Sequence, residues 1–193
     1  MVKNIILIAS IVILLTCTKS EKYEMKSMEW SYVYFLASQC KKNTPDTDII
    51  YADAVTKYAE KYNLPVKYIA RQIFAESRYD ASSVSAVGAR GPCQLMRYHD
   101  KFMREAEKYN PDMDMQSQYH LIYPSVEVQC RLIKNYLTRF VSYETALICY
   151  WSGENSQMMS NHVQSNYDFK STIYYKYILE DQYLERYVIG KGL

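Results

Sequence analysis

The segment around Glu76 constrains the fold more than any other part of the chain. Apolar residues precede it at helical spacing: Val66, Ile69, Ala70, Ile73 and Phe74. Glu76 follows Ile73 by three positions, so it shares the inward side of that helix at its C-terminal end. Residues 79–91, which come next, are rich in Ser, Ala and Gly and predict a loop. The pattern therefore predicts a helix after Pro65 that places a carboxylate on its inner face, beside a loop of small residues.

The position of Glu76 predicts a raised pKa for its carboxyl group. The C-terminal end of a helix carries a partial negative charge, which disfavours a second negative charge nearby. Partial burial disfavours the ionised form as well. A carboxyl group whose pKa is raised in this way suits general acid catalysis near neutral pH. Without other information, a glutamate at a helix end is more often a capped or ion-paired surface residue, so the neighbouring motifs must decide.

The rest of the chain predicts an all-α fold. Only five Gly and five Pro are present among 193 residues, which leaves few strand turns or flexible linkers. One helix should begin at Pro45-Asp46, with Asp46 or Thr47 as its cap, and end near 63–65. Four further helices are expected. The first runs from Pro92, opening around Gln94, to about Lys108, and the second covers 125–140. The third runs from a cap at 142–144 to Gly153, and the fourth covers about 169–188. Residues 111–123 and 152–168 are predicted to be loops.

The N-terminus is typical of an export signal. Lys3 precedes an apolar run from Ile5 to Leu15, which is too short to span a bilayer comfortably. Cys17 follows directly, and residues 14–17 resemble a bacterial lipoprotein cleavage box. An acylated Cys17 would tether the protein to a membrane of the cell envelope. An ordinary cleaved signal and an uncleaved anchor are the alternatives. We therefore expect a signal segment over 1–17, a spacer or accessory helix over 18–45 and a single domain over 46–193.

Charge, cysteine and histidine patterns exclude several functions. The net charge is +2, without a basic run, so no nucleic-acid partner is expected. Besides Cys17, the cysteines are Cys40, Cys93, Cys130 and Cys149. An exported protein can oxidise them, and four cysteines allow three pairings among which sequence does not choose. The histidines, His99, His120 and His162, are scattered and predict solvated or locally bonded surface residues. Neither a metal nor another cofactor is expected, and the protein should be a monomer.

One continuous motif surrounds Glu76. It comprises Glu76-Ser77, Val84-Ser85, Gly88-Ala89-Arg90-Gly91 and Gln94-Leu95-Met96. A second motif, Ala146 to Gly153, places Tyr150 near the end of an apolar helix. A third, weaker motif is Thr172-Ile173-Tyr174-Tyr175. In order and spacing, the three motifs resemble those of the lytic transglycosylase (SLT) domain, a lysozyme-like family, over about residues 48–180.

This resemblance implies a lysozyme-like helical domain with an active-site cleft. It implies cleavage of the β-1,4 bond between N-acetylmuramic acid and N-acetylglucosamine in peptidoglycan, with Glu76 as the catalytic acid and then base. The muramoyl C6 hydroxyl would close on C1 and leave a 1,6-anhydro end. The resemblance also implies substrate-binding roles for other motif residues, which are Ser85, Gly91, Gln94, Met96, Tyr150, Trp151 and Tyr175.

The chain departs from the family pattern at a few positions, which leaves alternatives open. Trp151 stands where the family has Asn, Pro92 and Cys93 replace an apolar pair, and Arg97 stands where Pro is common. One alternative is a goose-type lysozyme-like hydrolase, which would need a second carboxylate, with Asp80 or Asp100 as the nearest candidates. The other is a catalytically inactive lipoprotein that binds the cell wall.

Overall fold

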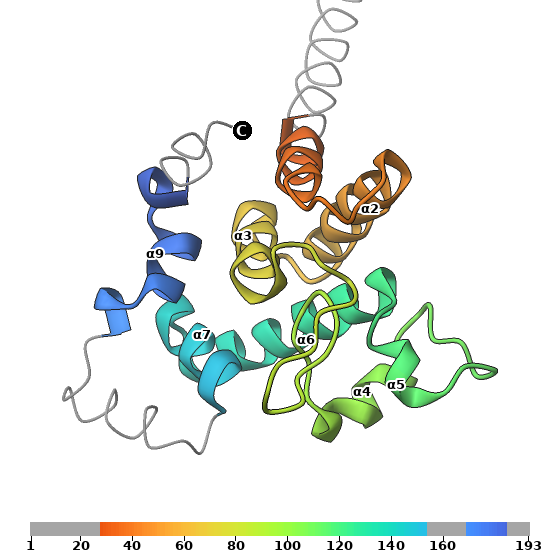
Figure 1. Cartoon of the computed structure of the whole chain (residues 1–193). Coiled ribbons are helices and arrows are strands. Elements are labelled where there is room, and N and C mark those ends of the chain that lie inside the picture. The colour runs from red at the N-terminus through yellow and green to blue at the C-terminus, as the bar shows by residue number, and fades with distance from the viewer. Residues whose placement is uncertain (1–27, 154–168, 185–193) are drawn as a thin grey trace, which may run out of the picture.

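The computed structural model describes residues 28–153 and 169–184, and its described parts are helical (Figure 1). Extended pairing within these ranges is limited to isolated bridges that join Arg90 to Val84 and to Leu95. The predicted all-α class is therefore confirmed. In the described ranges, no helix has both the length and the apolar character needed to cross a membrane.

The described helices range from short turns to α6, and most are joined by short connections. A first helix covers 28–38. The labelled α-helices are α2 (Pro45–Lys61), α3 (Val66–Ser77), α4 (Asp100–Arg104), α5 (Met115–Gln118), α6 (Ile122–Phe140), α7 (Tyr143–Ser152) and α9 (Ile173–Leu179). Two 3-10 turns, η1 (Arg97–His99) and η2 (Phe169–Ser171), precede α4 and α9.

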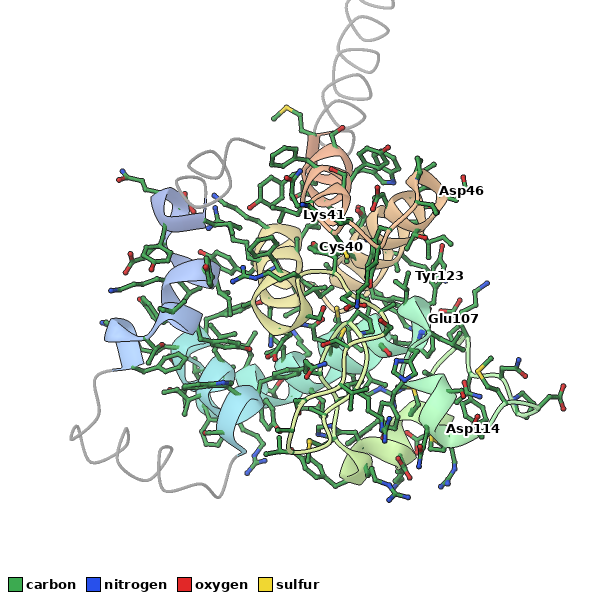
Figure 2. The ribbon with its side chains drawn as sticks, viewed as in Figure 1. Cys40, Lys41, Asp46, Glu107, Asp114 and Tyr123 are labelled. Carbon is green, nitrogen blue, oxygen red and sulfur yellow. The ribbon has the colours of Figure 1, made fainter. Side chains whose placement is uncertain are left out.

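The core lies around α3 and α6. Helix α6 packs against α2 and α7, and α3 packs against α2 and α9 (Figure 1). Side chains fill the space between these helices (Figure 2). Ile69 and Ile73 of α3, Val128 of α6 and Leu147 of α7 are fully buried. Burial of each such side chain contributes about 1.5–3 kcal/mol to folding, so the apolar stripes fix how the helices pack.

Helix α3 agrees with its prediction, whereas the start of α2 needs a correction. All five apolar residues of the α3 stripe are buried. The cap of α2 is Thr44 rather than Asp46 or Thr47, and its hydroxyl accepts a hydrogen bond from the Thr47 amide at 3.3 Å. This shift follows from Pro45, whose fixed φ and missing N–H suit the first helical position.

The predicted helix from Pro92 to Lys108 is wrong. Gly91 and Gln94 both have positive φ, at 72° and 48°, which interrupts helical geometry. Arg90 and Leu95 exchange backbone hydrogen bonds in both directions, at 2.9 and 3.0 Å, so this stretch closes a tight turn. Only η1 and the short α4 follow it. The backbone groups that a helix at Gln94 would use are thus partly committed to the loop.

After residue 110, α5 and α6 depart from the prediction, whereas α7 agrees with it. Helix α5 forms within the predicted loop because Asp114 caps it, accepting from the Gln116 and Ser117 amides at 3.0 Å. Helix α6 begins at Ile122 rather than Ser125, with Pro124 in its first turn. Ser142 caps α7 as predicted, and α7 ends just before Gly153, whose φ is 84°.

The predicted last helix, 169–188, is interrupted in the structure. Thr172 is extended and caps α9, and Glu180 is again extended, so that a new helical stretch covers 181–184. The end of this prediction, and nearly all of the predicted loop 152–168, lie outside the described residues, as does the predicted signal segment 1–17.

The helix over 28–38 packs on the domain. Its residues Val33, Leu36 and Ala37 are buried in the core. Arg71 of α3, which is fully buried, donates to the Tyr32 hydroxyl at 2.8 Å and to an Asp181 carboxylate oxygen at 2.9 Å. One side chain of α3 therefore joins the first described helix to the end of the described chain.

Candidate active site

Glu76 occupies the last turn of α3, where the chain turns into the loop of small residues. The turn is made by Arg78 and Tyr79, both with positive φ, at 59° and 63°. The Tyr79 side chain is fully buried and its hydroxyl donates to the Ala70 carbonyl at 2.9 Å. This buried bond fixes the direction in which the loop leaves the helix, and so the wall that faces Glu76.

A chain of hydrogen bonds reaches Glu76 from the core. The Tyr174 hydroxyl of α9 donates to Glu76 Oε1 at 2.6 Å. Gln72, one turn earlier on α3, donates from Nε2 to the Tyr174 hydroxyl oxygen at 3.2 Å. Gln72 and Tyr174 are both buried. The carboxyl group therefore has one oxygen held from the protein side.

The pKa of Glu76 is raised to about 7. Desolvation by the surrounding side chains is the main cause, and the hydrogen bond from Tyr174 opposes it by stabilising the carboxylate. The predicted direction is confirmed. At neutral pH the carboxyl group is therefore divided between its acid and base forms, which is what a group that both gives and takes a proton requires.

Glu76 opens on a pocket of about 220 Å³ between the loop and α7. The described residues that line it are Glu76, Ser85, Val87, Ala89, Gln94, Met96, Tyr98, His99, Tyr150 and Trp151. Five of the seven predicted substrate-binding residues are thus brought together around the predicted acid. Gly91 and Tyr175 are the two that do not line this pocket.

Ser85 and Gln94 shape the loop wall of the pocket. The Ser85 hydroxyl accepts from the Ala89 amide at 3.0 Å. The Gln94 side-chain amide donates to the Gly91 carbonyl at 3.0 Å and to the Ser83 carbonyl at 3.3 Å. Both side chains therefore tie the loop to itself while facing the pocket.

Gly91 has a packing role. Its φ is 72°, and a Cβ built there would lie 1.7 Å from the Tyr119 carbonyl oxygen. No side chain fits in that space, so the loop approaches Tyr119 closely only because this residue is glycine. The motif glycine is explained by this backbone contact rather than by a place in the pocket.

Tyr150 and Trp151 form the α7 wall. The Tyr150 hydroxyl donates to the Cys93 carbonyl at 2.6 Å, and burial raises the pKa of this phenol well above its usual value. Trp151 is 43% exposed and stacks on Tyr174, with ring centroids 5.4 Å apart. Tyr150 thus ties α7 to the loop, while Trp151 leaves aromatic surface open to a ligand.

Tyr174 is the residue that the sequence interpretation missed. The motif pointed to Tyr175, which is half-buried and makes an edge contact with Phe169. Thr172 caps α9 by accepting from the Tyr175 amide at 3.1 Å, which fixes the start of the helix. Neighbouring helical residues point about 100° apart, so only one of the two tyrosines faces α3. The adjacent tyrosines of the third motif were the sequence signal that could have pointed to Tyr174. Tyr98 and His99 were also missed, and no motif marked them.

The two carboxylates that a hydrolase would need lie outside the pocket of Glu76, whereas one histidine, His99, lines it. The Asp80 carboxylate pairs with Lys42, and Asp100 accepts from the Tyr119 hydroxyl at 2.5 Å. Burial lowers the pKa of His99 to about 4, so this pocket histidine is neutral and is not the solvated residue that was predicted. His120 bonds locally to the Ala81 carbonyl at 2.7 Å, and His162 lies outside the described residues.

The described ranges contain neither a disulfide nor a metal-binding cluster. Cys40, Cys93, Cys130 and Cys149 are not joined in disulfides, and the last three are buried. No group of three or more His, Cys, Asp or Glu side chains in the described part of the chain is arranged to hold a metal ion. Among the described residues that line the pocket, Glu76 is the one carboxylic acid.

Comparison with known families agrees with this geometry. The chain matches the family model described as the transglycosylase SLT domain over residues 53–173, which includes α3, the loop, α7 and the cap of α9. A search among curated proteins found no match. Since the family match covers more than half of the chain, the protein belongs to the SLT transglycosylase domain family, a lysozyme-like family of peptidoglycan-degrading lytic transglycosylases.

Proposed function

We propose that the protein is an active lytic transglycosylase that cleaves the β-1,4 bond between N-acetylmuramic acid and N-acetylglucosamine. The observation that carries the proposal is Glu76, the one carboxylic acid among the described residues that line the pocket, with a pKa raised to about 7 and one oxygen held by Tyr174. That arrangement supports proton transfer by Glu76 in both directions near neutral pH.

In the proposed reaction, Glu76 first donates its proton to the glycosidic oxygen as the bond to C1 breaks. The muramoyl C6 hydroxyl then attacks C1 on the same sugar. The Glu76 carboxylate takes the proton of that hydroxyl and returns to its acid form. The products are an N-acetylglucosamine hydroxyl end and a 1,6-anhydro muramoyl end. An internal nucleophile already lies near C1, so no second carboxylate is needed to position water.

The aromatic wall supports sugar binding in the proposed enzyme. Trp151 offers an exposed face beside Tyr174, and flat aromatic rings pack well against the apolar faces of sugars. The loop wall supplies polar groups from Ser85 and Gln94 across the pocket. Stacking by Trp151 would thus take the place of hydrogen bonding by an Asn amide at this position.

The two carboxylates considered for a hydrolase do not support that alternative. Asp80 is engaged by Lys42 and by the Ser82 amide, and Asp100 by Tyr119. Neither lines the pocket with Glu76. A water-activating base on the opposite side of the sugar is therefore missing from the described part of the pocket, and this favours the transglycosylase reaction.

The products of peptidoglycan digestion test the proposal. Purified cell-wall sacculi should yield muropeptides with 1,6-anhydro ends when the whole chain is added, as read by mass spectrometry. Glu76→Gln should release none. Glu105→Gln is the matched control, since Glu105 is an exposed residue that pairs with Arg131 away from the pocket. Reducing ends would show a hydrolase instead, and binding without release would show a wall-binding protein.

We also propose that the protein is exported and anchored in the cell envelope through an acylated Cys17. The support is the short apolar run and the cysteine that follows it. This location would bring the pocket to its proposed substrate, and the chain would act there as a monomer.

A further inference from the structure

Gln72 is an unusual residue to find in the packed core. Its side chain is fully buried on α3, one turn before Glu76. Its Nε2 donates to the Tyr174 hydroxyl at 3.2 Å, while its Oε1 is buried without a hydrogen-bond partner among the described residues. Leaving a buried acceptor unpaired costs about 1–3 kcal/mol. An apolar side chain would avoid this cost, so the retained amide calls for a role.

The hydroxyl of Tyr174 has one proton to donate, and its oxygen accepts from elsewhere. Gln72 occupies the accepting side with an N–H group. The hydroxyl proton is directed at Glu76 Oε1, 2.6 Å away. With its oxygen already engaged by Gln72, Tyr174 is less able to turn and accept a proton from the glutamic acid.

This arrangement determines which carboxyl oxygen of Glu76 carries the proton. If Oε1 receives the Tyr174 proton, the exchangeable proton of the acid must sit on Oε2. That oxygen has no hydrogen-bond partner within the described ranges, and Glu76 lines the pocket. The hydrogen-bond chain thus favours the form of the acid in which the proton is available to a ligand.

We propose that Gln72 is a positioning residue, which locks the Tyr174 hydroxyl as a donor to Glu76 Oε1 and so keeps the catalytic proton on Oε2. This inference rests on the proposed function of Glu76. It assigns a role to a residue outside the pocket, since Gln72 acts through Tyr174 and touches no substrate.

Among the described residues, burial and Tyr174 are the causes of the Glu76 pKa shift, and no neighbouring charge contributes to it. Tyr174 of α9, Tyr150 of α7 and Cys93 of the loop surround Glu76, and burial raises the pKa of each, so all three are neutral near pH 7. His99, across the pocket, is neutral because burial lowers its pKa to about 4. Burial and the Gln72–Tyr174 chain are therefore what govern the protonation of Glu76.

Two substitutions separate the donor role from simple packing. Gln72→Met keeps the length and removes the donor. The Tyr174 hydroxyl then donates less strongly, so the pKa of Glu76 should rise by up to about 0.5 unit and the maximal rate should fall about threefold. Tyr174→Phe supplies the second test, because Gln72 acts on Glu76 only through the Tyr174 hydroxyl. In the Tyr174→Phe background, Gln72→Met should leave the Glu76 pKa and the maximal rate unchanged.

Two readouts on the whole chain test this. One is the pH profile of anhydro-muropeptide release, whose fall at high pH reports loss of the acid. The other is a ¹³C NMR titration of the Glu76 carboxyl, which needs no activity. Gln118→Met is the matched control, because Gln118 is equally buried but bonds to Asn110 and Met113 near α5. It should lower thermal stability and leave the Glu76 titration unchanged.

The outcomes are distinct. The proposal holds if Gln72→Met raises the Glu76 pKa in the wild-type background but not in the Tyr174→Phe background, while the Gln118 control leaves it unchanged. It is overturned if the folded Gln72→Met protein titrates as the wild type, or loses rate only as its folded fraction falls. A wild type that releases no anhydro ends defeats the proposed function, and the NMR titration still decides whether Gln72 controls Glu76.

Discussion

Trp151 stacks on Tyr174, with the ring centroids 5.4 Å apart and the ring planes inclined by 11°. Tyr174 in turn donates its hydroxyl proton to Glu76. The largest departure from the family motif therefore touches the partner of the proposed catalytic acid. Trp151 links α7 to α9 at the site, so it supports the acid as well as facing the pocket.

Replacing Trp151 should weaken catalysis through Tyr174. An aromatic stack contributes about 0.5–1.5 kcal/mol beyond area burial, so Trp151→Ala should lower kcat by about threefold to tenfold and also raise KM through lost sugar stacking. Trp151→Phe keeps a ring and should retain most of kcat. Rates of muropeptide release give both constants. Equal activity of the two variants would contradict a stacking role.

Removing the Tyr174 hydroxyl should raise the pKa of Glu76 further. The hydrogen bond stabilises the carboxylate and opposes the effect of burial, so in Tyr174→Phe the pKa should rise above about 7, by up to one unit. The high-pH fall of the activity profile should move upward accordingly. Tyr175→Phe serves as the control because Tyr175 lies next along α9 and contacts Phe169 instead. A shift in the control of the same size would argue against a specific bond.

Glu76 should make stability depend on pH. Its folded pKa of about 7 exceeds the ordinary value of 4.5, so the unfolded chain releases this proton first as pH rises. Below pH 4.5, Glu76 therefore does not lower the free energy of unfolding. As the pH rises it lowers this free energy increasingly, up to a maximum above about pH 7.

Glu76→Gln removes that effect because the amide stays neutral. Relative to the wild type, the free energy of unfolding of the variant should therefore increase by about 1–3 kcal/mol between about pH 4.5 and pH 8. This appears as a Tm difference between the two proteins that grows with pH. Thermal unfolding followed by circular dichroism at both pH values measures this. A Tm difference that is constant with pH would show that Glu76 is ionised freely in the folded protein.

Gly91→Ala should destabilise the protein strongly. The added methyl group meets the Tyr119 carbonyl, and the positive φ adds strain, so a loss of about 3 kcal/mol or more is expected. Gly88→Ala is the control, with a φ of 89° but open space around its Cβ, and it should cost about 1 kcal/mol. Urea unfolding of both variants gives the comparison. Similar losses would mean that backbone strain, rather than the contact with Tyr119, explains Gly91.

Cys17→Ala should abolish membrane attachment if this cysteine carries lipid. In cells fed a labelled fatty acid, the wild-type chain should acquire the label and fractionate with membranes, because two or more acyl chains anchor a protein stably. The variant should lose the label. Cys40→Ala is the control, since Cys40 is partly buried and packs against the core. Label retained in the Cys17 variant would place the acylation elsewhere, whereas membrane association of an unlabelled wild type would indicate an uncleaved anchor.

The sequence predicted the elements whose signals are local. The α3 stripe follows from residue spacing, and the Ser142 cap and the Gly153 break of α7 follow from residue type. The helix predicted from Pro92 to Lys108 was wrong because the shape of this stretch depends on the Arg90–Leu95 backbone pairing and on the contact of Gly91 with Tyr119. The contact of Gly91 with Tyr119 joins distant parts of the chain, so no short window of sequence contains it. The Arg90–Leu95 turn is local, but it needs a positive φ at Gln94, which that residue type does not predict.

By itself, the sequence determined the acid and its setting: a glutamate on the inner side of a helix end, followed by a loop of motif residues. Helical periodicity is a local property, so it places Glu76 without knowledge of its neighbours. Only the tertiary structure decided that Tyr174, not Tyr175, bonds to the carboxyl group. It also decided that Gln72 donates to the Tyr174 hydroxyl and that Trp151 stacks on the Tyr174 ring. The physical reason is that the packing of α9 against α3 sets its rotation, and that rotation chooses which tyrosine reaches the acid.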